Sequence, residues 1–352
     1  MTSAAGSNAF DKDIIRRPDM EKSGVRHINM IKLGEVLTDE KLQPAIKSLY
    51  VYSSNPACTA PEQDKVMAGL AREDLFTVVH ERFMTDTARF ADIVLPATSS
   101  LEHEDIYYSY GQYVIQRGQQ LIPPVGESKS NWQVTQLLAE AMGLTDKFFR
   151  QDEIDLVNHF MESTKTSWPL PVDLTALSQG EPAALPLPEN YKLDFKTPSG
   201  KIEILNPKMK PALPDYFPPH YAQDSGEFIL INSPDPRILD SSFNEREELT
   251  RSGIMVLQLN PDDASRLNLQ AGNHVLAENA QGSAEFVVKI SPEIAPLTAV
   301  SEGVWWQEYT PRGNTNRLTA ARTTDKAAGS TFYDVRINLR PLHKKLDNNP
   351  KA

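Results

Sequence analysis

The chain has 352 residues, of which 40% are hydrophobic and 24% are charged, and its formal net charge is −11. This length and composition are ordinary for a globular protein with two domains. The negative charge argues against a nucleic-acid partner, because binding a polyanion requires clustered Lys and Arg. The single cysteine, Cys58, excludes an internal disulfide framework and any Cys-rich zinc or iron–sulfur site built from this chain alone.

Membrane and export signals are weak in this sequence. No apolar run approaches the roughly 18 residues that a membrane helix requires. Residues 1–20 contain no apolar core of the kind found in signal peptides. We therefore expect no membrane span and a cytoplasmic location.

Strand and helix patterns alternate between about Lys47 and Gly143. The sequence predicts strands over Leu49–Tyr52, Phe76–Val79 and Ile93–Leu95, with a helix over Glu62–Ala71 between the first two. This βαβ order indicates a parallel sheet. It leads us to expect a Rossmann-like α/β domain over residues 1–150.

A further helix is predicted to begin at Ser130, where Ser130 and Gln133 form a capping box. Gly143 is expected to close this helix. Its apolar residues share one face of the helix; they are Val134, Leu137, Leu138, Ala141 and Met142.

Prolines crowd the chain between about Arg150 and Phe228, which disfavours regular structure. We interpret residues 151–225 as a proline-rich bridging segment. From Glu227 onward β signals dominate and predict a small β-barrel over residues 226–345. A short helix is expected to begin at Asn260, and a hairpin at Ala280–Gly282. The predicted strands are Phe228–Asn232, Val256–Leu259, His274–Asn279, Ala284–Ile290 and Val335–Leu339.

Polar residues follow the predicted strands of the first domain. The apolar segment 46–56 ends in small polar residues, and the stretch 77–116 joins two strands to many hydrogen-bonding side chains. Open α/β sheets present such loops to ligands at the carboxyl ends of their strands. We expect the two segments to form an edge of a site for a polar, extended ligand.

The run Glu102-His103-Glu104-Asp105 contains residue types that bind metals. Four consecutive residues cannot all face one ion, however, and no second His lies four residues away. We do not expect a metal site here.

Several short motifs are informative when they are taken together. They are Arg26-His27-Ile28-Asn29-Met30, Ser54-Asn55-Pro56-Ala57, Ala91-Asp92-Ile93-Val94-Leu95-Pro96, Leu101-Glu102-His103-Glu104 and the sequence from Ser130-Asn131-Trp132 onward. These motifs resemble the C-terminal portion of the molybdopterin oxidoreductases of the dimethyl sulfoxide reductase superfamily. The resemblance implies a Rossmann-like parallel-sheet domain followed by a double-psi β-barrel domain that binds the molybdopterin dinucleotide.

The resemblance also implies cofactor contacts. Some of these residues have structural alternatives: Asn55 suits an Asn-Pro turn, Thr85 a helix N-cap, Asn131 a helix start, and His80 with Glu81 an exposed strand end. His-Glu at that strand end departs from the Ser/Asp-type pair common in the family. Glu102 and Glu104 are expected to hold the surrounding loop. The candidate cofactor-binding residues are Asn55, His80, Glu81, Thr85, His103, Asn131, Ser233, Arg237, Ser241, Ser242, Asn316 and Tyr333.

By resemblance, the chain binds and orients the arms of a molybdopterin guanine dinucleotide that carries molybdenum or tungsten. The metal ligand and any iron–sulfur cluster are expected in an amino-terminal half that this chain lacks, so no catalytic residue is assigned and the chain alone is expected to be inactive. Its expected partners are the cofactor and an amino-terminal half or electron-transfer subunit.

Three alternatives remain open at this stage. In the first, the chain is one subunit of a split enzyme whose other half is a separate polypeptide. In the second, the chain is a fragment or remnant. The barrel could instead serve a non-enzymatic adaptor. A nicotinamide-dependent dehydrogenase is disfavoured, because no G-x-G-x-x-G follows a strand.

Overall fold

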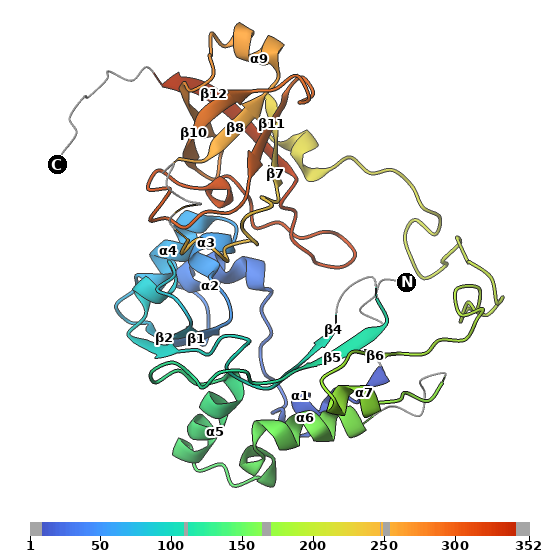
Figure 1. Ribbon diagram of the computed structural model, residues 1–352. Coiled ribbons are helices and arrows are strands. Elements are labelled where there is room, and N and C mark those ends of the chain that lie inside the picture. The colour runs from blue at the N-terminus through green and yellow to red at the C-terminus, as the bar shows by residue number, and fades with distance from the viewer. Residues whose placement is uncertain (1–8, 109–111, 164–169, 247, 249–253, 343–352) are drawn as a thin grey trace. The chain divides into compact units, whose positions relative to one another are not determined.

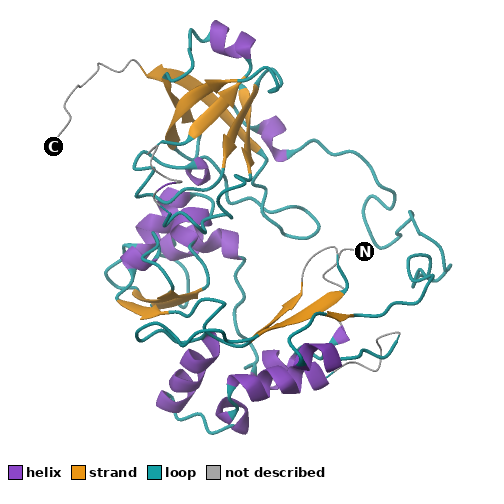
Figure 2. Cartoon of the chain, viewed as in Figure 1, coloured by secondary structure: helices purple, strands orange, loops and turns teal. Residues whose placement is uncertain are grey.

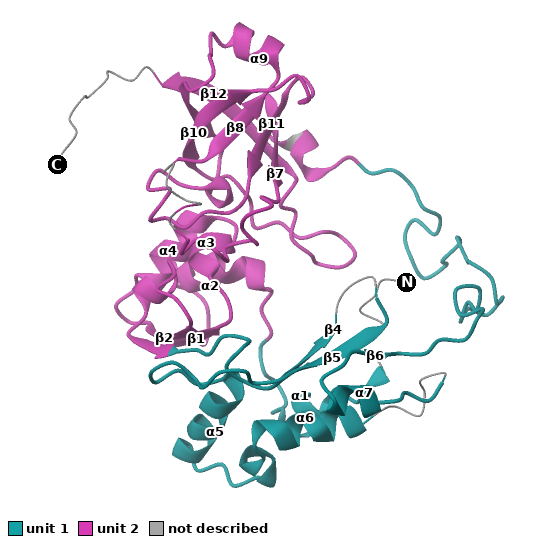
Figure 3. Cartoon of the chain, in the orientation of Figure 1, with its two compact units in different colours: residues 1–26, 96–217 teal, residues 27–95, 218–352 magenta. Residues whose placement is uncertain are grey.

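The structure, a computed structural model, describes residues 9–108, 112–163, 170–246, 248 and 254–342. The chain divides into two compact units (Figure 3): unit 1 is Met1–Arg26 with Pro96–Phe217, and unit 2 is His27–Leu95 with Pro218–Ala352. The contiguous domains expected from the sequence, with limits at 150 and 225, stay a prediction. The compact units divide the chain differently, because residues 27–95 pack with the C-terminal segment.

Unit 2 contains a three-stranded sheet in the order β1-β2-β3, in which β1 and β2 pair in parallel. Helices α2 and α4 lie on one side of β1 and β2 (Figure 1) and bury Leu37, Val66 and Leu70. The elements are η3 (Met30–Lys32), α2 (Leu33–Thr38), β1 (Ser48–Tyr52), α3 (Pro56–Thr59), α4 (Gln63–Leu70), β2 (Phe76–Glu81), η4 (Ala88–Phe90) and β3 (Ile93–Pro96).

The second part of unit 2 is a closed six-stranded barrel in the order β10-β8-β11-β7-β12-β9 (Figure 2). Two pairs, β7 with β11 and β8 with β10, are parallel, and the other pairs are antiparallel. The elements are η6 (His220–Gln223), β7 (Phe228–Ser233), β8 (Val256–Leu259), α9 (Pro261–Arg266), β9 (His274–Glu278), β10 (Ser283–Ile290), β11 (Thr298–Glu302), η7 (Thr315–Arg317) and β12 (Val335–Leu342).

Alternation of apolar and polar residues explains the barrel, because inward side chains fill its core while outward ones meet water. Phe228, Leu257, Phe286 and Ile337 are fully buried within it. The five strands predicted from the sequence are confirmed, as are the helix capped by Asn260 and the hairpin between β9 and β10. Strand β11 was not predicted, because its five residues include Ala and Glu, which are depleted in strands and weaken its β signal.

Unit 1 is built around a three-stranded antiparallel sheet, β4-β5-β6, with helices packed on a core that includes Phe10, Ile115, Phe160 and Leu177. Among the described residues of both units, no helix is long and apolar enough to cross a membrane. The elements are α1 (Asp13–Arg16), η2 (Pro18–Met20), β4 (Asp105–Tyr108), β5 (Val114–Gly118), α5 (Asn131–Ala141), η5 (Lys147–Arg150), α6 (Glu153–Glu162), α7 (Thr175–Ser178) and β6 (Ala183–Ala184).

Helix α6 lies within the segment interpreted as a proline-rich bridge, so regular structure extends further than expected. The first proline after residue 150 is Pro169, which leaves a proline-free stretch with helical apolar spacing. Asp152 caps this helix by accepting from Asp155 N at 2.8 Å, and Phe160 and Met161 are buried. Extended connections dominate only from about residue 186 to 219 (Figure 2).

The predicted capping box of α5 is confirmed, since Ser130 Oγ accepts from Gln133 N at 3.1 Å and the Gln133 side chain accepts from Ser130 N at 3.2 Å. Gly143 adopts φ +72° just beyond the C-cap residue, Met142. Most of the apolar face of this helix is exposed. Leu137, Leu138 and Met142 are 50%, 43% and 73% exposed.

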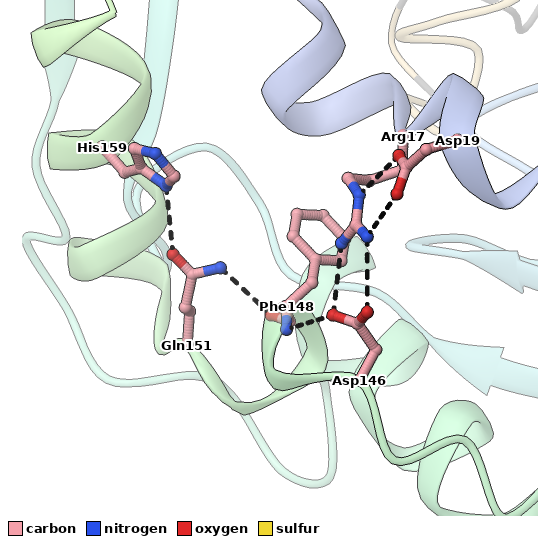
Figure 4. A network of polar contacts seen from close by, with 6 residues as sticks. All are labelled: Arg17, Asp19, Asp146, Phe148, Gln151 and His159. Carbon is pink, nitrogen blue, oxygen red and sulfur yellow. Dashed lines mark hydrogen bonds and ion pairs between the residues drawn. The ribbon is translucent and has the colours of Figure 1, made fainter.

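An arginine ties the N-terminal segment of unit 1 to the region after α5 (Figure 4). Arg17 donates from Nε and Nη2 to Asp19 at 2.8 and 2.7 Å, and from Nη1 to Asp146 at 3.3 Å. Its guanidinium also lies 4.8 Å from the centroid of the Phe148 ring. The hydrogen bonds from Arg17 lower the pKa values of Asp19 and Asp146. Gln151 extends this network to His159 on α6.

A buried carboxylate lies in the barrel wall at Glu285, whose side chain is 1% exposed. It bonds His274 Nδ1 at 2.5 Å and forms an ion pair with Arg312. Burial disfavours the charged form of Glu285, but the hydrogen bonds to His274 and Arg312 outweigh burial, so its pKa lies below the ordinary value of 4.5.

Replacing this carboxylate by Glu285→Gln is expected to lower the free energy of unfolding by about 2 kcal/mol at pH 7, because charged hydrogen bonds are lost. Because the pKa of Glu285 is lower in the folded state than in the unfolded state, its charged form stabilises the fold at pH values above the unfolded pKa. This contribution to stability is lost as the pH falls through the folded pKa. The difference between wild type and variant should therefore shrink below about pH 4.5, as measured by urea unfolding. A difference that stays constant to pH 3 contradicts this account.

Candidate functional site

Helix α3, directly after β1, is held by a barrel loop of the same unit. Asn316 Nδ2 donates to Cys58 O at 2.9 Å, and Asn314 Nδ2 donates to the same oxygen at 3.3 Å. Cys58 Sγ donates to Trp305 O at 3.3 Å. These buried contacts join segments about 250 residues apart, so the loops after β1 and after β11 pack together.

Asn55, the N-cap residue of α3, is 5% exposed. Its Oδ1 accepts from Thr87 N at 3.1 Å and from Thr87 Oγ1 at 2.8 Å. Its Nδ2 is buried without a hydrogen-bond partner among the described residues, as is Trp305 Nε1. An unpaired buried donor costs about 1–3 kcal/mol, which an incoming acceptor would offset. These two donors therefore suit the carbonyl or phosphate oxygens of a ligand.

The loop after β7 contributes a second wall of this region. Asn244 is fully buried and donates from Nδ2 to Val304 O at 3.1 Å, while its Oδ1 accepts from Trp306 N at 3.1 Å. Trp306 Nε1 donates to Ser241 O at 2.8 Å. Asn232 donates to Gly303 O at 3.1 Å and also contacts Thr315 Oγ1. The loops after β7 and β11 are thus held together by side chains.

Three non-glycine residues adopt positive φ angles in these loops: Ser53 at 49°, Asp240 at 51° and Phe243 at 70°. Such conformations cost energy for residues with a Cβ and cluster where loops bind ligands. Their position beside Asn55 and Ser241 is consistent with backbone shaped for binding.

Burial governs the electrostatics of this region. Burial raises the pKa of the Cys58 thiol well above its ordinary value, and the neighbouring Asp86 carboxyl raises it further. Burial likewise raises the pKa of Asp86, which accepts from Gln307 N at 2.8 Å. Cys58 is therefore a neutral hydrogen-bond donor and not a thiolate ligand.

The structure brings four of the candidate residues into this network or next to it: Asn55, Asn316, Ser241 and Thr85. Thr85 is buried, and its Oγ1 accepts from Ala88 N at 3.3 Å. Asn316 is buried as well, and its amide is engaged by Cys58. Ser241 presents its carbonyl to Trp306.

The other candidates in unit 2 are less enclosed or are engaged elsewhere. Arg237 donates from Nε and Nη2 to Asp235 at 3.0 and 2.7 Å, so that carboxylate competes with any phosphate for the guanidinium fork. Ser242 pairs with Leu239 through its backbone in a tight turn. Ser233 ends β7, Glu81 accepts from Arg82 N, His80 is buried at the end of β2, and Tyr333 is 59% exposed.

His103 and Asn131 belong to unit 1. His103 Nδ1 hydrogen-bonds Thr98 Oγ1 at 2.8 Å, and Asn131 is exposed in the first turn of α5. The expectation that Glu102 and Glu104 hold their loop is confirmed. Glu102 accepts from the backbone of Ser99 and Val125, and Glu104 pairs with Arg117 at 2.8 Å.

Within the described ranges, no group of three or more His, Cys, Asp or Glu residues could hold a metal ion. The carboxylates of Glu102 and Glu104 are directed at different loop partners.

Sequence reasoning missed several residues that organise this region. Asn244 and Asn314 donate to backbone carbonyls of other segments, and Gln307 N donates to the Asp86 carboxylate. Cys58 links α3 to Trp305. An Asn-rich stretch at 314–316 was a usable signal. The pairing of that stretch with Cys58 was not, because it depends on tertiary contacts between distant segments.

Comparison with known proteins gives the class of this fold and site. Residues 20–141 match the family model described as "Molybdopterin oxidoreductase", and residues 228–336 match "Molydopterin dinucleotide binding domain". The fold is similar to acetylene hydratase from Pelobacter acetylenicus, with a TM-score of 0.62 and 24% identity over 79% of this chain and 40% of that one. The two family models give the class of the chain, and the likeness to acetylene hydratase concerns the fold alone.

The chain belongs to the molybdopterin oxidoreductase family. It is 36% identical to "Probable oxidoreductase YoaE" of Bacillus subtilis strain 168, over 96% of this chain and 50% of that protein. It is 27% identical to "Dimethyl sulfoxide reductase DmsA" of Haemophilus influenzae, over 86% of this chain and 43% of that protein. The chain thus spans about half the length of the curated relatives it matches.

Proposed function

We propose that this chain binds and orients the dinucleotide arms of a molybdopterin guanine dinucleotide cofactor within a molybdenum- or tungsten-dependent oxidoreductase. The observation that carries the proposal is Asn55 Nδ2, a buried donor without a partner among the described residues, at the end of β1. The carboxyl ends of parallel strands are where α/β sheets bind ligands. The family match supplies the class of ligand.

The residues present fit such a group. Asn55 and Trp305 would donate to acceptors on the cofactor, and Ser233, Ser241 and Ser242 on the loop after β7 would offer hydroxyl and backbone groups to phosphate oxygens. The remaining candidates of unit 2 would complete the contacts: His80, Glu81, Thr85, Arg237, Asn316 and Tyr333. In unit 1, His103 and Asn131 would contribute further polar contacts.

When bound, the cofactor's metal supplies the redox chemistry, and the protein supplies binding, orientation and access. In this proposal the metal ligand and any iron–sulfur cluster come from the part of the relatives that this chain does not span. The chain then acts as part of a larger or split enzyme. The closed barrel with two parallel strand pairs supports the double-psi assignment of the dinucleotide-binding domain.

A second candidate is a non-enzymatic adaptor that uses the barrel for protein interaction. Its distinguishing expectation is a folded chain that takes up no pterin and no nucleotide. The unpartnered donors at Asn55 and Trp305 favour the cofactor site instead, because an adaptor has no use for unsatisfied buried donors.

Recognition of the guanine arm can be tested with GDP and CDP as probes of the dinucleotide. We expect GDP to raise the Tm of the purified chain, since a ligand at ten times its Kd adds about 1.4 kcal/mol of stability. CDP at the same concentration should leave the Tm unchanged. Equal shifts with both nucleotides would contradict the guanine assignment, and no shift with either would contradict the dinucleotide site.

A further inference from the structure

The sheet of unit 2 has an aromatic face that nothing in the described residues fully covers. The side chains of paired residues on neighbouring parallel strands lie on the same side of a sheet. The register pairs Tyr50 with Val78 and Ser48 with Phe76. Tyr50, Tyr52 and Phe76 are 41%, 57% and 51% exposed. We call Tyr50, Tyr52, Phe76 and Val78 the aromatic face. Its two tyrosine rings lie 6.0 Å apart between centroids.

The opposite side of the same strands is buried. Val51 is 7% exposed, while Thr77 and Val79 are fully buried. Val51 and Val79 pack against Ala88 of η4, and Leu49 also packs against the cluster formed by α2 and α4. Helices α2, α3 and α4 lie together on one side of β1 and β2 (Figure 1).

This one-sided burial is unusual for parallel strands. Parallel sheets are covered on both faces, and their strands read as nearly continuous apolar runs. The segments Leu-Tyr-Val-Tyr in β1 and Phe-Thr-Val-Val in β2 have that character, with large apolar residues on both sides. In addition, β1 and β3 are the edges of this sheet as described. The strands are therefore suited to a sheet that is larger and covered on its second face.

We propose that the aromatic face docks the polypeptide that corresponds to the half of the relatives not spanned by this chain. YoaE aligns with 96% of this chain, which includes the sheet, and carries an equal length beyond the alignment. An occupant that covers a parallel sheet must be a folded polypeptide with an apolar surface. This inference does not depend on cofactor binding.

The test uses the complete chain and, as its probe, the part of Bacillus subtilis YoaE that the chain does not match. Hydroxyl-radical footprinting should find Tyr50, Tyr52 and Phe76 reactive in the chain alone. After co-expression, the two polypeptides should co-purify at equal stoichiometry, and the reactivity of the three rings should fall several-fold.

The variant Tyr50→Lys/Phe76→Lys places two charges on the aromatic face. Because both positions are exposed, the Tm of the chain alone should be unchanged, while the Kd for the YoaE half should rise about tenfold or more. Val256→Lys, at a 40% exposed position on the barrel, is the matched control and should bind as wild type does.

Three results would overturn the proposal. Protection of the three rings in the monomeric chain alone would show that the chain covers its own face. Protection in a homodimer would assign the face to a second copy. Equal binding of the YoaE half by wild type and the double variant would place the contact elsewhere.

Discussion

Replacing Asn55 by Asp should abolish cofactor retention while leaving the fold intact. Asp keeps the oxygen that accepts from Thr87 N and Oγ1, but it exchanges the unpaired Nδ2 donor for an acceptor. An acceptor that faces a ligand oxygen loses the hydrogen bond and adds repulsion, which together cost about 3 kcal/mol, or more than a hundredfold in Kd. Bound pterin per mole of protein measures the effect.

Thr87→Val is the matched control for Asn55→Asp. It removes the hydroxyl that donates to Asn55 Oδ1 and leaves the Asn55 amide in place. The same hydroxyl accepts from Ala57 N at 3.0 Å, so two buried hydrogen bonds are lost. The free energy of unfolding should fall by about 1–3 kcal/mol, and cofactor retention by the folded protein should be unchanged. If Asn55→Asp retains pterin as wild type does, the amide is a structural cap and not a cofactor contact.

Phe286→Ala should reduce the stability of the barrel by about 3–5 kcal/mol, the usual cost of truncating a buried Phe. Phe286 is fully buried on β10 in the core that also contains Met255 and Leu318. Removing the ring leaves a cavity that a closed barrel cannot readily collapse, because its strands are fixed by pairing on both sides. Urea unfolding followed by tryptophan fluorescence measures the change, since Trp305 lies in the same core.

Phe83→Ala serves as the control for Phe286→Ala. Phe83 is in the same unit but is 41% exposed, so its truncation should change the free energy of unfolding by no more than about 0.5 kcal/mol. A loss of less than about 1 kcal/mol for Phe286→Ala would contradict the packed barrel core.

Local patterns in the sequence predicted local structure well. The alternation over Val256–Leu259 and His274–Glu278 matches β8 and β9, and the capping box at Ser130 matches the start of α5. Strand β11 escaped prediction because it is held by pairing with β7 and β8, which no local pattern records. The exposure of Leu138 and Met142 was also unpredictable, because an apolar helix face does not show what covers it.

Tertiary contacts in the candidate site were likewise not predictable from local sequence patterns. Asn55 and Asn316 were identified from the sequence through the family resemblance. The sequence does not show that Asn316 binds Cys58 O or that Gln307 binds Asp86, because these contacts join the α/β segment to the barrel across more than 200 residues. The division into units was similarly hidden, since the chain leaves unit 1 after Arg26 and returns to it at Pro96.

The central claim is that this chain holds the dinucleotide arms of a molybdopterin cofactor. The most direct test is to purify the chain anaerobically from a molybdate-supplemented host, alone and co-expressed with the remaining half of YoaE. Molybdenum, tungsten and the fluorescence of oxidised pterin are then measured per mole of protein. We predict stoichiometric pterin in the co-expressed complex, with loss of pterin in Asn55→Asp. A stable complex that contains neither pterin nor metal would contradict the claim and favour the adaptor.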